Sequence, residues 1–62
     1  MKRQSKSQHP LSYRTYYPRQ SGKDEISEPV LADTVREAMD KLGTSSMNNL
    51  QVMQDGRWVW VI

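Results

Sequence analysis

Two kinds of side chain alternate around a central turn in residues 50–62, which read LQVMQDGRWVWVI. The dipeptide Asp55-Gly56 predicts a two-residue β-hairpin turn, because both of its positions require positive φ. The turn then fixes the register, and these residues face each other: Gln54 and Arg57, Met53 and Trp58, Val52 and Val59, Gln51 and Trp60, and Leu50 and Val61. Successive side chains of a strand point to opposite faces, so one face is aliphatic: Leu50, Val52, Val59 and Val61. The other face carries Gln51, Met53, Trp58, Trp60 and Ile62.

A helical pattern precedes the hairpin. Thr34, with Glu37 three residues later, fits a capping box, and Gly43 can adopt the left-handed conformation that ends a helix. We therefore predict a helix that begins after Thr34 and runs to about Leu42. Apolar residues recur there at spacings of three and four, and we expect this stripe to pack on the aliphatic face of the hairpin. The stripe comprises Leu31, Val35, Ala38, Met39 and Leu42.

The segment before the helix has a weaker pattern. Residues 11–17 are rich in aromatic and β-branched side chains and predict a strand that ends at Pro18. Residues 20–25 are polar and predict a loop around Gly22. Residues 26–31 contain Pro29, which fits either the first turn of a helix or a short edge strand. We favour the extended alternative, because a better helix start follows at Thr34.

These elements predict an α+β fold. Residues 1–10 are polar after Met1 and cannot bury enough apolar surface to offset their ordering entropy, so we expect a disordered, flexible basic arm. Residues 11–62 are expected to form a single small domain. In it, a small antiparallel sheet, made of the C-terminal hairpin and one or two N-terminal strands, packs on a single helix. Because 62 residues are near the lower limit for a domain that folds alone, the tryptophan face is the largest apolar surface that still needs a cover.

Charge is distributed unevenly along the chain. The first 23 residues have a net charge of +6 and no acidic residue; their basic residues are Lys2, Arg3, Lys6, Arg14, Arg19 and Lys23. Residues 24–62 have a net charge of −4, which leaves +2 for the whole chain. Basic residues interleaved with tyrosines are typical of polyanion binding, so these six residues and Arg57 are candidate contacts for nucleic acid. The alternative is an arm that only improves solubility.

Trp58 and Trp60 also allow two interpretations. In the first, tyrosines of residues 11–17 cover them within a monomer or a dimer. In the second, they stay exposed and bind a partner, since tryptophan is enriched at interface hot spots and stacks on nucleic-acid bases. The partner-binding residues would then be Trp58, Trp60, Met53 and Ile62. An uncovered hydrophobic strand at the edge of the sheet also favours pairing with another chain.

The chain lacks the residues that most catalytic and metal sites need. It has no cysteine, and His9 is its one histidine, so neither a zinc site of the usual kind nor a Ser-His-Asp set is expected. Its isolated glycines do not form a phosphate-binding loop. We therefore expect no enzyme activity, cofactor, metal or small-molecule substrate. No signal peptide and no apolar run of roughly 20 residues is present, so we expect a cytoplasmic protein with no membrane partner.

Two hypotheses for the function follow. In the first, the chain is a small regulatory or inhibitory protein that acts by protein–protein contact, on a larger protein or on itself as a homodimer. A machine that processes nucleic acid is one such target. In the second, the chain binds DNA or RNA directly through its basic arm and its aromatic residues. We favour the first, because residues 24–62 are acidic.

Overall fold

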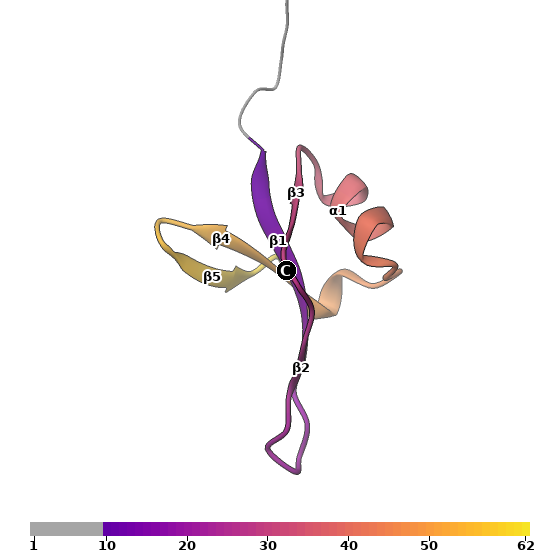
Figure 1. The fold of residues 1–62 in the computed structure, drawn as a ribbon, viewed down its shortest axis with the longest axis vertical. Helices are drawn as coiled ribbons and strands as arrows, with labels where there is room; N and C mark the ends of the chain where they lie inside the picture. The colour runs from indigo at the N-terminus through magenta and orange to yellow at the C-terminus, as the bar shows by residue number, and fades with distance from the viewer. Residues whose placement is uncertain (1–9) are drawn as a thin grey trace, which may run out of the picture.

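The computed structural model describes residues 10–62 and consists of one helix and a five-stranded antiparallel sheet (Figure 1). The expected α+β class is therefore confirmed. The predicted disorder of the basic arm falls, except for Pro10, outside the described residues. Along the chain, the elements are β1 (Leu11–Tyr17), β2 (Glu25–Ile26), β3 (Val30–Ala32), α1 (Val35–Leu42), the short 3-10 helix η1 (Met47–Asn49), β4 (Leu50–Gln54) and β5 (Arg57–Trp60).

The first strand, β1, lies in the middle of the sheet. It pairs with β4 along one side and with β2 and β3 along the other, and β5 lies beyond β4. Tyr13 faces Val52 on one neighbour and Val30 on the other. The extended interpretation of the segment around Pro29 is confirmed, although that segment forms two short strands.

A β-bulge separates β2 from β3. Tyr16 pairs with Ile26 and Tyr13 pairs with Val30, so three residues on one side of the ladder face two on the other. The amide of Ser27 donates to the carbonyl of Thr15 (3.0 Å), and the Ser27 hydroxyl accepts from the Thr15 amide (2.9 Å). The serine side chain thus replaces a ladder carbonyl. Pro29 fits within the bulge, where the ladder requires no N–H.

The hairpin has the predicted register. The pairs run from Gln54 and Arg57 at the turn to Gln51 and Trp60, and the Val61 amide donates to the Leu50 carbonyl (3.0 Å). The turn residues Asp55 and Gly56 have φ of 53° and 80°. A two-residue hairpin turn requires positive φ at both positions. The dipeptide Asp55-Gly56 was therefore sufficient to predict this hairpin.

The helix has the predicted boundaries and caps. The Thr34 hydroxyl accepts from the amide of Glu37 (3.1 Å), and Gly43 has a φ of 71°. The amides of Gly43 and Thr44 donate back to the carbonyls of Asp40 and Met39, as in a Schellman motif. The Glu37 carboxylate accepts from the Asp33 amide, at 3.0 Å. Together with the Glu37–Lys41 ion pair (3.4 Å), this bond lowers the pKa of Glu37.

The core lies between α1 and one face of the sheet. Its buried residues are Tyr13, Ala32, Ala38, Leu50 and Val52, and Val35, Met39, Leu42, Val59 and Val61 pack around them. The helix lies mainly over β3 and β1, while the β4–β5 hairpin projects away from it (Figure 1). The expectation that the helix packs on the aliphatic face of the hairpin is therefore correct for Leu50 and Val52. Val59 and Val61 are only half-buried.

The prediction of the apolar stripe was wrong for one residue. Leu31 belongs to β3, where it faces Ser12, and its side chain is 58% exposed. Its neighbours Val30 and Ala32 pack in the core instead. The helical spacing placed Leu31 with the stripe, but a strand of period two turns it to the opposite face.

Candidate functional site: the open face of the sheet

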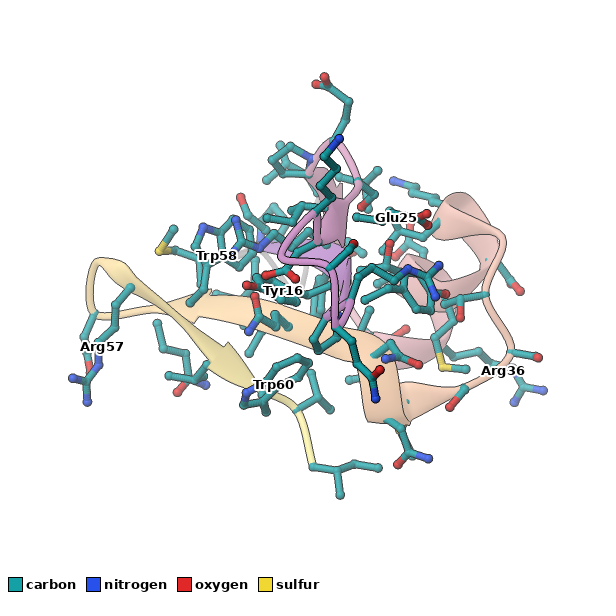
Figure 2. The ribbon with its side chains drawn as sticks, turned by 90° about the horizontal axis from the view of Figure 1, so that it is seen from below. Tyr16, Glu25, Arg36, Arg57, Trp58 and Trp60 are labelled. Carbon is teal, nitrogen blue, oxygen red and sulfur yellow. The ribbon has the colours of Figure 1, made fainter. Side chains whose placement is uncertain are left out.

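The face of the sheet opposite α1 has no second layer of helix or strand among residues 10–62. We call it the open face and define it by six side chains: Arg14, Tyr16, Gln51, Met53, Trp58 and Trp60. They come from β1, β4 and β5, and the registers of these strands place them on one side. Figure 2 shows Tyr16, Trp58 and Trp60 gathered beside these strands. The candidate site is therefore a surface rather than a cleft.

Arg14 is held in place on this face by three neighbours. Its guanidinium carbon lies 4.3 Å from the centroid of the Trp58 ring and 5.6 Å from that of Tyr16. Its Nε donates a 2.9 Å hydrogen bond to the side-chain oxygen of Gln51, which is only 6% exposed. The bond satisfies a buried polar group, and the ring contact is a cation–π interaction. Arg14 therefore has a defined orientation before any ligand binds.

Tyr16 and Trp60 form the second contact pair of the open face. Their ring centroids are 5.6 Å apart with an interplanar angle of 71°, an edge-to-face arrangement. Trp60 still has 46% of its surface exposed. The pair therefore leaves much of the indole ring available for a further contact.

The loop between β1 and β2 fixes Tyr16 from the other side. The Tyr16 hydroxyl donates to the carboxylate of Asp24, which also accepts from the Arg19 amide (2.9 Å). The hydrogen bond to Asp24 is the main cause that raises the pKa of Tyr16, and partial desolvation is the second. The same hydrogen bond is the main cause that lowers the pKa of Asp24, and the hydrogen bond from the Arg19 amide is the second. An Arg19–Glu25 ion pair (2.9 Å) spans the same hairpin.

The predicted partner-binding residues lie together. Trp58, Trp60 and Met53 are on the open face, and Met53 is opposite Trp58 in the hairpin. Ile62 follows β5 and is 72% exposed. The structure adds Tyr16 and Gln51 to these residues. Strand alternation in the hairpin had already placed Gln51 on this face, whereas the position of Tyr16 depends on the pairing of β1 with β4.

The predicted polyanion-binding residues are more scattered. Arg14 joins the tryptophans, but Arg57 lies at the tip of the hairpin with a side chain directed away from them (Figure 2). Arg19 is paired with Glu25, and Lys23 is exposed in the loop that precedes β2. Lys2, Arg3 and Lys6 lie outside the described residues. The guanidinium carbon of Arg19 also lies 5.9 Å from the centroid of the Tyr17 ring. Within residues 10–62, the structure thus brings one predicted cation, Arg14, to the tryptophans of the open face.

The tyrosines of β1 do not form a cover over the tryptophans. Their strand lies beside the hairpin in the same sheet, and only Tyr16 contacts a tryptophan ring, from its side. Tyr13 is buried on the helix side, and the hydroxyl of Tyr17 lies 3.5 Å from that of Thr44. Among residues 10–62, the open face therefore has lateral contacts only.

Two grooves flank the helix. One, of about 310 Å³, lies beside β5 and is lined by the apolar residues Leu11, Val35, Val59 and Val61 among others. The other, of about 560 Å³, lies between α1 and the loop after it and includes Met39 and Met47. Among residues 10–62, no group of His, Asp or Glu is placed to hold a metal ion. No helix in that range is long and apolar enough to cross a membrane.

Comparison with known proteins yields no relative. No protein family, no curated protein and no solved structure matches the chain. The properties of the open face are therefore the basis for any functional assignment. Chemically, this face offers two indole rings, a phenol and a guanidinium on a rigid sheet.

Proposed function

We propose that this protein is a small non-enzymatic regulator or inhibitor that docks on a larger protein through its open face. The observation that carries the proposal is the grouping of Arg14, Tyr16, Trp58 and Trp60 on a face that no helix or strand of residues 10–62 covers. Tryptophan, tyrosine and arginine are the residue types most enriched at interface hot spots. Trp60 is 46% exposed, so its indole ring can bury further surface against a partner.

The site is also organised before binding. Gln51 and Trp58 hold Arg14, while Trp60 and Asp24 hold Tyr16. Binding therefore requires little ordering of these side chains, which usually costs about 0.5–1.5 kcal/mol for each one immobilised. Such pre-organisation supports a role in recognition.

The charges of this face indicate the chemistry of the partner. The Nε of Arg14 is bonded to Gln51, but in the described part of the chain no hydrogen bond or ion pair engages its terminal nitrogens. A carboxylate can accept from the terminal nitrogens of a guanidinium. The favoured partner surface is thus apolar, with an aspartate or glutamate placed opposite Arg14.

The test uses substitutions that change the face without removing core residues. Photo-crosslinkers installed at Met53, opposite Trp58 on the open face, and, as the control, at Arg36 on the helix should capture a partner in cells at Met53 only. Against the identified partner, Trp60→Ala should weaken binding by about tenfold or more, as expected for a hot-spot residue. Arg14→Lys keeps the charge but loses the planar guanidinium, and it should weaken binding while circular dichroism stays unchanged. Equal capture at both positions, or unchanged affinity in both variants, would overturn the proposal.

One arrangement favours a second function, the direct binding of single-stranded nucleic acid. Aromatic side chains next to an arginine on an exposed sheet face are a common platform for stacking bases. Binding of a labelled oligonucleotide should then fall steeply with salt and should weaken when residues 1–9 are deleted. The deletion must stop before Leu11, because β1 is the central strand of the sheet. The absence of binding at low salt would reject this alternative.

A further inference from the structure

The two outer edges of the sheet differ in their protection. The β2/β3 edge is interrupted by a bulge that contains Pro29, and Glu25 and Glu28 are exposed along it. Bulges, prolines and charges are the devices by which natural proteins prevent pairing of a sheet edge. The β5 edge has no proline or bulge, and its one charged residue, Arg57, lies next to the turn. Only the β5 edge is thus suitable for adding a strand.

The register shows which backbone groups of β5 are available. A two-residue turn makes Gln54 and Arg57 a hydrogen-bonded pair, and such pairs alternate along an antiparallel ladder. The bond from the Val61 amide to the Leu50 carbonyl (3.0 Å) agrees with this alternation. Arg57, Val59 and Val61 therefore direct their N–H and C=O groups to β4. Trp58 and Trp60 direct theirs outward, where no strand of residues 10–62 pairs with them.

We propose that the occupant of the β5 edge is a second copy of this chain, paired antiparallel about a two-fold axis at Val59. The sequence of the strand is self-complementary in this arrangement, because Trp58-Val59-Trp60 reads the same in both directions. Val59 then faces the same residue of the second copy, and Trp58 faces Trp60 of the second copy. Aromatic side chains meet on the open face and valines meet on the helix side. A two-fold axis requires such self-complementarity of the surface.

Charge and exposed surface agree with this pairing. Arg57 of one copy lies opposite Val61 of the other, so the two arginines are four residues, or about 13 Å, apart along the strands. That separation exceeds the screening length of about 8 Å at physiological salt. Pairing also draws the half-exposed Trp60 and the neighbouring groove of about 310 Å³ toward the two-fold axis. These surfaces extend the contact toward the roughly 800 Å² per partner that a stable interface buries.

The dimer would enlarge the open face. Both copies contribute Trp58 and Trp60 to one side of a continuous sheet, with the two Arg14–Trp58 contacts placed symmetrically on either side of the axis. The composite surface combines the open faces of both copies. It suits a partner that is itself two-fold symmetric or that has two docking segments.

A single introduced cysteine tests the arrangement, since the chain has none of its own. Residues opposite each other in a non-hydrogen-bonded pair have Cα atoms about 4.5 Å apart, within the range for a disulfide. Under mild oxidation, Val59→Cys should form a crosslinked dimer about tenfold or more faster than Ser45→Cys, an exposed control in the loop after α1. Equal rates would overturn the proposed pairing.

A second measurement separates the backbone pairing from the side chains. The mass in solution should rise from 7.2 kDa to twice that value as concentration increases from about 1 μM to about 1 mM, the range for weak interfaces. A synthetic chain with an N-methylated Trp60 amide keeps every side chain but blocks the outward donor, and it should remain monomeric with an unchanged circular dichroism spectrum. A monomer throughout the range for the unmodified chain, or a dimer that survives N-methylation, would overturn the proposal. Because the N-methylated chain retains the open face, its binding of a larger partner is tested independently.

Discussion

The two faces of the sheet are stabilised by different kinds of contact. On the helix side, Leu50 is fully buried and Val52 nearly so, under a layer formed by α1 and its neighbours. On the open face, Arg14, Tyr16 and Trp60 contact each other or their neighbours from the side, and no helix or strand in the described part of the chain lies above them. The first arrangement excludes water and supplies the free energy of folding. The second orders side chains while leaving their outer surfaces available, which is what recognition requires.

The largest effect should come from a substitution on the helix side. Leu50→Ala removes a fully buried side chain and leaves a cavity, so it should lower the free energy of unfolding by about 2–5 kcal/mol. For a domain this small, that loss approaches the whole stability. Urea unfolding followed by tryptophan fluorescence measures it.

The matched control for Leu50→Ala is the same substitution on the opposite face. Leu31→Ala removes a side chain that is 58% exposed, and it should change the free energy of unfolding by less than about 0.5 kcal/mol. Similar losses for the two variants would contradict the assignment of the core to one face.

An intermediate effect is expected at Arg14. Arg14→Met keeps an aliphatic chain of similar length but removes the cation that contacts the Trp58 ring and the hydrogen-bond donor to Gln51. The free energy of unfolding should fall by about 1–2 kcal/mol, because the cation–π contact is lost and the buried amide oxygen loses its partner. Thermal unfolding measures the loss, and the emission of Trp58 should change in the folded state. Arg36→Met, on the exposed side of the helix, is the control and should leave both unchanged.

The smallest effect is a dependence on pH that originates at the border of the open face. The pKa of Asp24 is below its ordinary value of 3.8 in the folded chain, chiefly because of the bond from Tyr16. A carboxyl group with a depressed pKa stabilises the folded chain at pH values above its ordinary pKa. That stabilisation is lost as the pH falls through the pKa of the folded state. Carboxyl NMR should therefore give Asp24 a midpoint below 3.8. In Asp24→Asn this part of the acid dependence should be missing, whereas Asp40→Asn removes a carboxylate from the helix and controls for net charge.

The same hydrogen bond acts at the alkaline end with the opposite sign. The pKa of Tyr16 is above its ordinary value of 10.0, so the protonated phenol is favoured in the folded chain. The Tyr16 hydroxyl therefore stabilises the folded chain at pH values below its ordinary pKa, and this stabilisation is lost as the pH rises through the pKa of the folded state. Tyr16→Phe keeps the ring against Trp60 and should remove this alkaline loss, as followed by thermal unfolding. A loss of equal size in the variant would show that the bond to Asp24 does not contribute.

Elements with local signals were predictable from the sequence. Asp55-Gly56 fixed the hairpin register, and Thr34, Glu37 and Gly43 fixed the helix, because the backbone groups they satisfy are within a few residues. The placement of Leu31 was wrong because its strand follows from pairing with β1, which no local pattern encodes. The central position of β1 is equally non-local.

The candidate site was predictable in part for the same reason. Alternation in the hairpin placed Trp58 and Trp60 on one face, as the structure confirms. The cation that joins them comes from β1, and the bond from Arg14 to Gln51 links residues 37 positions apart. Sequence alone grouped Arg14 with the basic arm, since the alignment of β1 beside β4 depends on burial of Tyr13 and Leu50 in the shared core.

The central position of β1 also determines the order in which the sheet can be assembled during synthesis. Among the described elements β1 is made first, whereas its neighbour β4, which begins at Leu50, is made after all the others except β5. The hairpin has a local turn and can form within about 1–10 μs once it is made, whereas β1 must wait for it. The nascent chain therefore exposes Tyr13 until β4 has been translated. Premature termination before Leu50 would release a fragment without the central residue of the core, which makes such fragments substrates for rapid proteolysis.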